Sequence, residues 1–150
     1  MSKKSDWKPD DSVIEGPPGM DRIKEALGAL ESRGIDTKNR VITSRDPGMD
    51  EVRYLLRRPG MPPGIESWQL PVVLENCPIF AFLTVAQPGA VVPIHSHKRD
   101  LFRIVLSGAI ITNGIELKTG DWMFVPKNVD YGYSATLNPG HGAIIAHCYG

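Results

Sequence analysis

The sequence predicts an all-β protein that is preceded by a short helical segment. From residue 65 onward, short apolar runs rich in Val, Ile and Phe alternate with turn signals, and no helical periodicity separates them. Asn113-Gly114, flanked by Ile and Thr residues, is typical of a two-residue hairpin turn. About nine strands at this spacing favour a barrel or a sandwich. The expected strands are 67–74, 79–86, 90–94, 101–106, 109–112, 115–117, 122–125, 131–135 and 143–148.

The chain before the barrel divides into two parts. Residues 1–19 are charged and rich in Pro and Gly, which is typical of an arm that is loose or laid across another surface. Residues 20–64 are expected to form a helical and extended lead-in packed on a barrel of residues 65–150. Apolar residues at three- and four-residue steps predict a helix over 20–33, and a shorter helix is expected over 50–57 with Asp50 as its cap.

Length, charge balance and apolar content limit the kinds of partner that we expect this protein to bind. The 150 residues suit one domain, and 17 basic residues balance 17 acidic ones, so nothing in the charge favours nucleic acid. No apolar run is long enough to span a bilayer, and the polar start does not resemble a signal peptide. The two cysteines, Cys77 and Cys148, form no disulfide framework. We therefore expect a cytoplasmic protein that binds neither membrane nor nucleic acid.

One stretch carries a spaced pattern of glycines and histidines. Gly89 is followed after five residues by His95-Ser96-His97, and ten residues separate His97 from Gly108. A second run begins at Gly120 and places Pro126 after five residues. Residues two apart on a strand share a face, so His95 and His97 point the same way. A pair of imidazoles held by a barrel is the start of a transition-metal site.

This pattern resembles the two motifs of the cupins, G-x5-HxH-x3/4-E-x6-G and G-x5-PxG-x2-H-x3-N, over about residues 79–148. The resemblance implies a jelly-roll β-barrel with His95 and His97 facing inward as ligands of one divalent transition metal (Fe, Zn, Mn, Ni or Cu). The sequence departs from the motifs where the remaining ligands belong. Leu101 stands at the glutamate position, and Tyr131 stands at the position of the last histidine.

Four further residues are candidates for the pocket. His147 would face inward opposite Tyr131, as a third metal ligand, if residues 138–140 form the tip of a hairpin centred on Pro139. Tyr131 and His97 are the candidates for catalysis. Counting by twos from Leu101 makes Arg103 inward, where a substrate carboxylate or phosphate, or an internal acid, would meet it. Trp122 is expected to pack in the barrel or to line the pocket and contact substrate.

Three functions fit these residues. The first is a metal-dependent enzyme, and the resemblance implies a dioxygenase, lyase, isomerase or cyclase acting on a small organic acid, enol or diketone. The second is a metal-free isomerase or epimerase with a His base and a Tyr acid. The third is a ligand-binding or sensory protein without turnover. Because exposed sheet edges need covering, a homodimer is also expected.

Overall fold

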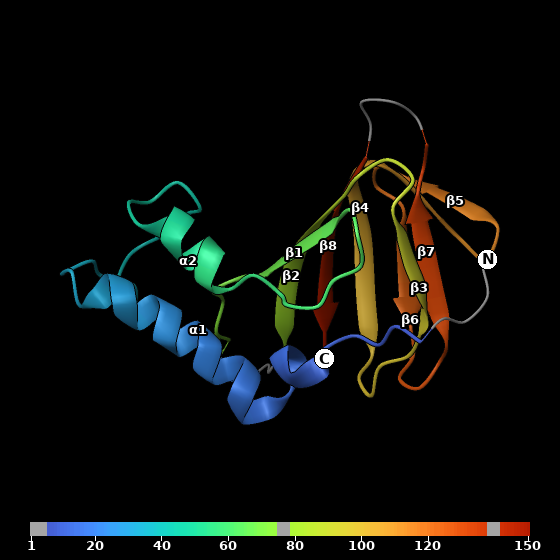
Figure 1. Ribbon diagram of the computed structural model, residues 1–150. Helices are drawn as coiled ribbons and strands as arrows, with labels where there is room; N and C mark the ends of the chain where they lie inside the picture. Colours follow the sequence, from blue (N-terminus) through green and yellow to red (C-terminus); the bar gives the residue numbers. More distant parts are fainter. Residues whose placement is uncertain (1–5, 75–78, 138–141) are drawn as a thin grey trace.

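The computed structural model describes residues 6–74, 79–137 and 142–150. Figure 1 shows a barrel of strands with two helices beside it, next to the β1 and β2 side. The chain begins with a short 3-10 helix η1 (Asp11–Ile14), followed by α1 (Gly16–Glu31) and α2 (Met49–Leu55). The strands are β1 (Ile65–Gln69), β2 (Phe80–Ala86), β3 (Val91–His95), β4 (Leu101–Thr112), β5 (Ile115–Lys118), β6 (Trp122–Val125), β7 (Tyr131–Ala135) and β8 (Ala143–Tyr149).

The strands form one curled antiparallel sheet in the order β1-β2-β8-β4-β7-β3, with β5 and β6 also paired to β4. Buried and less buried residues alternate along β2 and β8, as expected where one face of a sheet covers a core. The barrel core is built mainly from Phe82, Leu101, Val105, Ile110 and Ile145. The predicted jelly-roll β fold with a short N-terminal helical segment is confirmed.

Strand β4 is a single long strand where the sequence predicted two. Two strands were expected, with Gly108 ending the pattern of the first motif, but β4 runs unbroken through Gly108 to Thr112. Its register shifts between Val105 and Ser107, and Gly108 has a φ of +73°. This bulge bends β4 so that its first half pairs with β6 and β8 and its second half with β5 and β7. One strand therefore joins both sides of the barrel.

The helical segment forms a second, smaller core. Helix α1 begins at Gly16, inside the predicted arm, because Pro17 and Pro18 suit the first turn of a helix. The residue before α2 is Gly48, with a φ of +85°, and not the predicted cap Asp50. The buried side chains between the helices are Ala26, Leu30, Met49, Val52 and Leu56. None of the helices in the described part of the chain is both long and apolar enough to cross a membrane.

Candidate functional site

His95 and His97 meet inside one end of the barrel, as the sequence predicted. His95 is the last residue of β3, and His97 lies two residues further on, in the loop that leads to β4. Both are buried, with 5% and 4% exposure. Their Nε2 atoms lie 3.1 Å apart. Two ligands that neighbour each other around a metal with bonds of about 2.1 Å are themselves separated by about 3.0–3.4 Å, so this spacing suits a shared cation.

The opposite nitrogens of the two rings fix how the rings are presented. Nδ1 of His95 lies 2.7 Å from the carbonyl oxygen of Pro93, and Nδ1 of His97 lies 2.9 Å from Oδ1 of Asp11. Both partners are acceptors, so each Nδ1 carries a proton, and a neutral ring then presents its Nε2 lone pair to the other ring. Burial, with the nearby His97 and Arg103, lowers the pKa of His95 to about 4. A cation between the two facing lone pairs would stabilise this arrangement.

Tyr131 adds an oxygen to this pair. It pairs with His95 across β3 and β7, and its hydroxyl oxygen lies 3.3 Å from Nε2 of His97. Burial raises the pKa of Tyr131 above its ordinary value, although Arg103, which hydrogen-bonds to it, acts in the opposite direction. Tyr131 therefore keeps its proton at neutral pH and stands beside the histidines as a hydrogen-bond donor.

His147 points into the barrel, but not from the position predicted for it. Strand β8 lies between β2 and β4, so His147 pairs with Phe82 and Arg103 and not with Tyr131. The predicted hairpin pairing of β7 with β8 is wrong, and its tip lies outside the described residues. The Thr84 hydroxyl donates to Ser67 and therefore accepts from Nε2 of His147, at 2.8 Å. Nδ1 of His147 is then a buried acceptor with no hydrogen-bond partner among the residues that the structure describes.

Arg103 lies at the centre of the barrel with 3% exposure. Its guanidinium carbon is 4.5 Å from the centre of the Tyr133 ring. Within residues 6–74, 79–137 and 142–150 no carboxylate forms an ion pair with it, and its Nε and Nη1 have no hydrogen-bond acceptor. A buried cation in this state is costly unless an anion meets it. Of the two possibilities left open by the sequence, a ligand anion is the one that this geometry favours.

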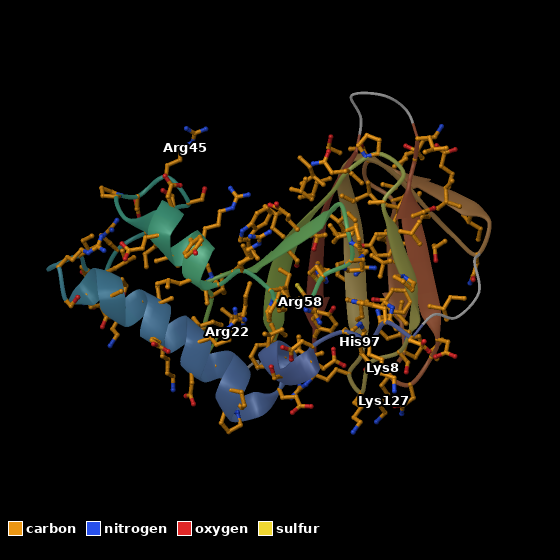
Figure 2. All side chains as sticks on the ribbon, viewed as in Figure 1. Lys8, Arg22, Arg45, Arg58, His97 and Lys127 are labelled. Atoms are coloured by element: carbon orange, nitrogen blue, oxygen red, sulfur yellow. The ribbon has the colours of Figure 1, made fainter. Side chains whose placement is uncertain are left out.

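The N-terminal arm closes the end of the barrel over these residues. Trp7 and Pro9 line the cavity together with the two histidines and Arg103, and the remaining space holds about one water molecule. Figure 2 shows His97 where the arm crosses the barrel, with Arg58 nearby. Trp7 contacts the His95 ring, with 5.1 Å between ring centres, and donates from Nε1 to the carbonyl oxygen of Gly60. Asp11 accepts from both His97 and Arg58.

Trp122, a sequence candidate for contact with substrate, lies away from the cavity, and Leu101 occupies the motif's glutamate position. Trp122 is 63% exposed on β6, where it faces outward beside Phe102, so the structure gives its proposed contact with substrate no support. Leu101 is fully buried in the barrel core at the position where the motif has glutamate. Its neighbour Asp100 is exposed and accepts a hydrogen bond from the Lys127 backbone. No carboxylate from this segment therefore reaches the histidines.

Few side chains are therefore placed to act as metal ligands. In the described part of the chain no three His, Cys, Asp or Glu side chains gather closely enough to hold an ion. The residues that do converge are His95, His97 and the phenol of Tyr131. The two imidazole lone pairs that face each other suit a divalent transition metal, and most of its coordination sphere would be left to water or substrate.

No protein-family model and no curated protein matches the chain. Among solved structures it is similar to KdgF from Halomonas sp., at 23% identity and a TM-score of 0.48 over 58% of this chain and 78% of that one. It is also similar to an RmlC-like cupin from Shewanella frigidimarina, at 26% identity and a TM-score of 0.48 over 57% and 75% of the chains. A match to a complex of Rhodobacter sphaeroides SigE with the anti-sigma ChrR covers 94% of this chain and 60% of that chain, at 17% identity and a TM-score of 0.50. At this identity the likeness bears on the fold alone.

Proposed function

The chain has the cupin fold, and we propose that it is a small metal-dependent enzyme acting on an oxygenated organic acid. The observation that carries this proposal is the pair of buried Nε2 atoms of His95 and His97, 3.1 Å apart with both Nδ1 atoms committed elsewhere. His95 and His97 would hold the metal, with Tyr131 beside them. Bound there, a divalent metal acts as a Lewis acid and orients a chelating substrate.

The residues deeper in the barrel support an acid as the substrate. Among the described residues, Arg103 has two donor nitrogens without an acceptor, Nε and Nη1, and His147 opposite it has an acceptor without a donor, Nδ1. A carboxylate suits the donors of Arg103, and a neighbouring hydroxyl suits the acceptor of His147. A small hydroxy acid, or a keto acid in its enol form, supplies both groups.

Tyr131 and the arm have separate tasks in this proposal. Tyr131 retains its proton and lies within reach of His97, so it is the candidate to donate a proton to a substrate oxygen. Closing the arm over the bound acid would exclude water and strengthen the contact between Arg103 and the carboxylate. Dioxygenase, lyase, isomerase and cyclase reactions all use such a site, and the substrate's other bonds decide among them.

Metal analysis tests the proposal directly. We expect purified protein, reconstituted separately with Fe, Mn, Ni, Cu and Zn salts, to retain about one metal ion per chain by elemental analysis. Replacing His95 or His97 with Gln should abolish retention. His147→Gln is the matched control and should retain the metal, because Nε2 of His147 is bonded to Thr84. Wild-type protein that retains no metal above trace would overturn the proposal.

A second candidate, ligand binding without turnover, is favoured by one observation. No three metal-binding side chains of the His, Cys, Asp or Glu type converge in the part of the chain that the structure describes. Binding a small acid on Arg103 needs no metal. Stoichiometric binding of a hydroxy acid to metal-free protein, with no product after hours of incubation, would favour this function over the enzyme.

A further inference from the structure

Asp11 is the residue through which the arm reaches the histidine pair. It is the first residue of η1, and the Asp10 side chain caps this turn by accepting from the Ser12 backbone. A single oxygen of Asp11, Oδ1, accepts from Nδ1 of His97 at 2.9 Å and from Nη2 of Arg58 at 3.3 Å. Arg58 and His97 are buried, whereas the Asp11 side chain is 26% exposed. The carboxylate therefore lies at the boundary between the site and solvent.

The rings of His95 and His97 are oriented by hydrogen bonds to different parts of the chain. The acceptor for Nδ1 of His95 is the backbone of Pro93, two residues away on the same strand. The acceptor for Nδ1 of His97 comes from a segment 86 residues earlier in the sequence. His95 is therefore oriented by β3 itself, but the tautomer and ring direction of His97 depend on the arm being in place.

Resting on the metal binding proposed above, we infer that Asp11 is a positioning residue for the metal and that metal binding and closure of the arm are linked. A cation on Nε2 of His97 withdraws electron density from the ring, so Nδ1–H becomes a stronger donor to Asp11. The metal thus tightens the bond that holds the arm. By reciprocity, an arm that stays closed raises the metal affinity by the same factor.

Other contacts of the arm make this link specific to one end of the barrel. Trp7 lies against His95 and bonds to Gly60, so the segment from Trp7 to Asp11 touches both histidines. The cavity beneath holds about one water molecule, which is too little for an organic acid. Substrate entry therefore requires the arm to move, and the metal sets how readily it does so.

The test compares Asp11→Asn with Asp6→Asn, the same chemical change at an exposed position of the same arm. Zn²⁺ is the probe, with affinity measured by competition against a chelator and arm mobility by hydrogen–deuterium exchange of residues 6–19. We expect Asp11→Asn to lower Zn²⁺ affinity by about 10- to 100-fold, the usual effect of losing a carboxylate behind a ligating histidine. Asp6→Asn should match wild type. Zn²⁺ should slow exchange of the arm in wild type and in Asp6→Asn, and not in Asp11→Asn.

The outcomes separate this inference from the proposed function. If wild type and Asp6→Asn bind neither Zn²⁺ nor any of the other four metals, the metal proposal itself is overturned. A chain that binds one of those four and not Zn²⁺ is put through the same test with that metal. Zn²⁺ that binds wild type while arm exchange stays unchanged, or binds Asp11→Asn as tightly as wild type, would overturn only the link. If Asp11→Asn does not fold, the metal-dependent exchange of the wild-type arm still decides the question, because it needs no variant.

Discussion

At the scale of single residues, two buried arginines in the same barrel differ in whether a carboxylate meets them, although the Nε of each has no hydrogen-bond partner among the described residues. Arg58 donates to the Tyr149 hydroxyl and pairs with the Asp11 carboxylate. Arg103 has no carboxylate among the described residues, and its Nε and Nη1 lack acceptors. Arg58 is therefore bonded as a structural ion pair is, whereas the lack of a described carboxylate beside Arg103 supports the anion-binding role proposed for it.

Replacing each arginine with Met, which keeps much of the volume and removes the charge, separates the two roles. Arg58→Met removes the cation beside Asp11, which keeps its bond to His97 and some contact with solvent, and we expect a loss of about 1.5–3 kcal/mol in the free energy of unfolding. Arg103→Met removes an uncompensated charge and should leave stability unchanged, or raise it by up to about 2 kcal/mol, since lost ring contacts offset part of the gain. Urea denaturation of metal-free protein measures both. A loss above about 2 kcal/mol in Arg103→Met would make Arg103 structural instead.

The residues that sequence could predict are those whose neighbours are close in the chain. His95 and His97 were predicted to share a face because strand alternation acts over two residues, and the structure brings them together. Asp11 was missed because nothing local marks an Asp in a polar arm as the partner of His97. Only the closed barrel, which brings the arm across its end, creates that contact.

At the scale of elements, the bulge in β4 depends on a glycine for two separable reasons. Gly108 has a φ of +73°, which disfavours any side chain, and a Cβ placed there would overlap the carbonyl oxygen of Gly142. Gly114, in the β4–β5 turn, has the same φ of +73°, and no atom of the described residues lies within 4 Å of the place of its Cβ. The two positions share the backbone strain and differ in the close contact.

This pair gives a matched prediction for alanine substitution. Gly114→Ala should cost about 1 kcal/mol, the price of a left-handed conformation alone. Gly108→Ala should cost about 3 kcal/mol or more, because β4 or the segment at Gly142 must also shift. Thermal or urea unfolding of both variants measures the difference. Equal losses would mean that the contact between β4 and Gly142 relaxes freely and does not fix the bulge.

The strands also show which features of the fold the sequence could predict and which it could not. Strand positions and turns were largely predicted, since alternation and Asn-Gly signals are local. The partner of β8 was not, because neighbours in sequence need not be neighbours in the sheet, and β8 pairs with β2 and β4. His147 therefore faces inward as predicted but stands beside Arg103 and not opposite Tyr131.

At the scale of the whole molecule, the outer face of the sheet formed by β6, β4, β8 and β2 is unusually apolar. We define this outer face by Trp122, Phe124, Phe102, Ile104, Leu106, Ile144, Ala146, Cys148, Ala81, Leu83 and Val85. None of these side chains is a Lys, Arg, Asp or Glu, and five of them are between 39% and 63% exposed. With ordinary side-chain areas, the outer face exposes on the order of 700 Å².

Area and chemistry together favour a second copy of the chain on the outer face. A standard interface buries about 800 Å² on each partner, and interfaces between identical subunits are the more apolar class. A two-fold axis through the outer face would pair it with itself, which needs no complementary charges. The homodimer predicted from sequence through sheet edges is therefore proposed here through this face of the sheet.

Light scattering of the purified chain at micromolar concentration should give the mass of a dimer. Phe124→Lys combined with Trp122→Lys should give a monomer, because two unpaired cations buried in the interface would cost several kcal/mol. Ile115→Lys is the control, since Ile115 is 60% exposed on β5, outside the outer face, and this variant should remain a dimer. A wild-type monomer, or a dimer that survives both lysines, would show that the outer face does not join two copies.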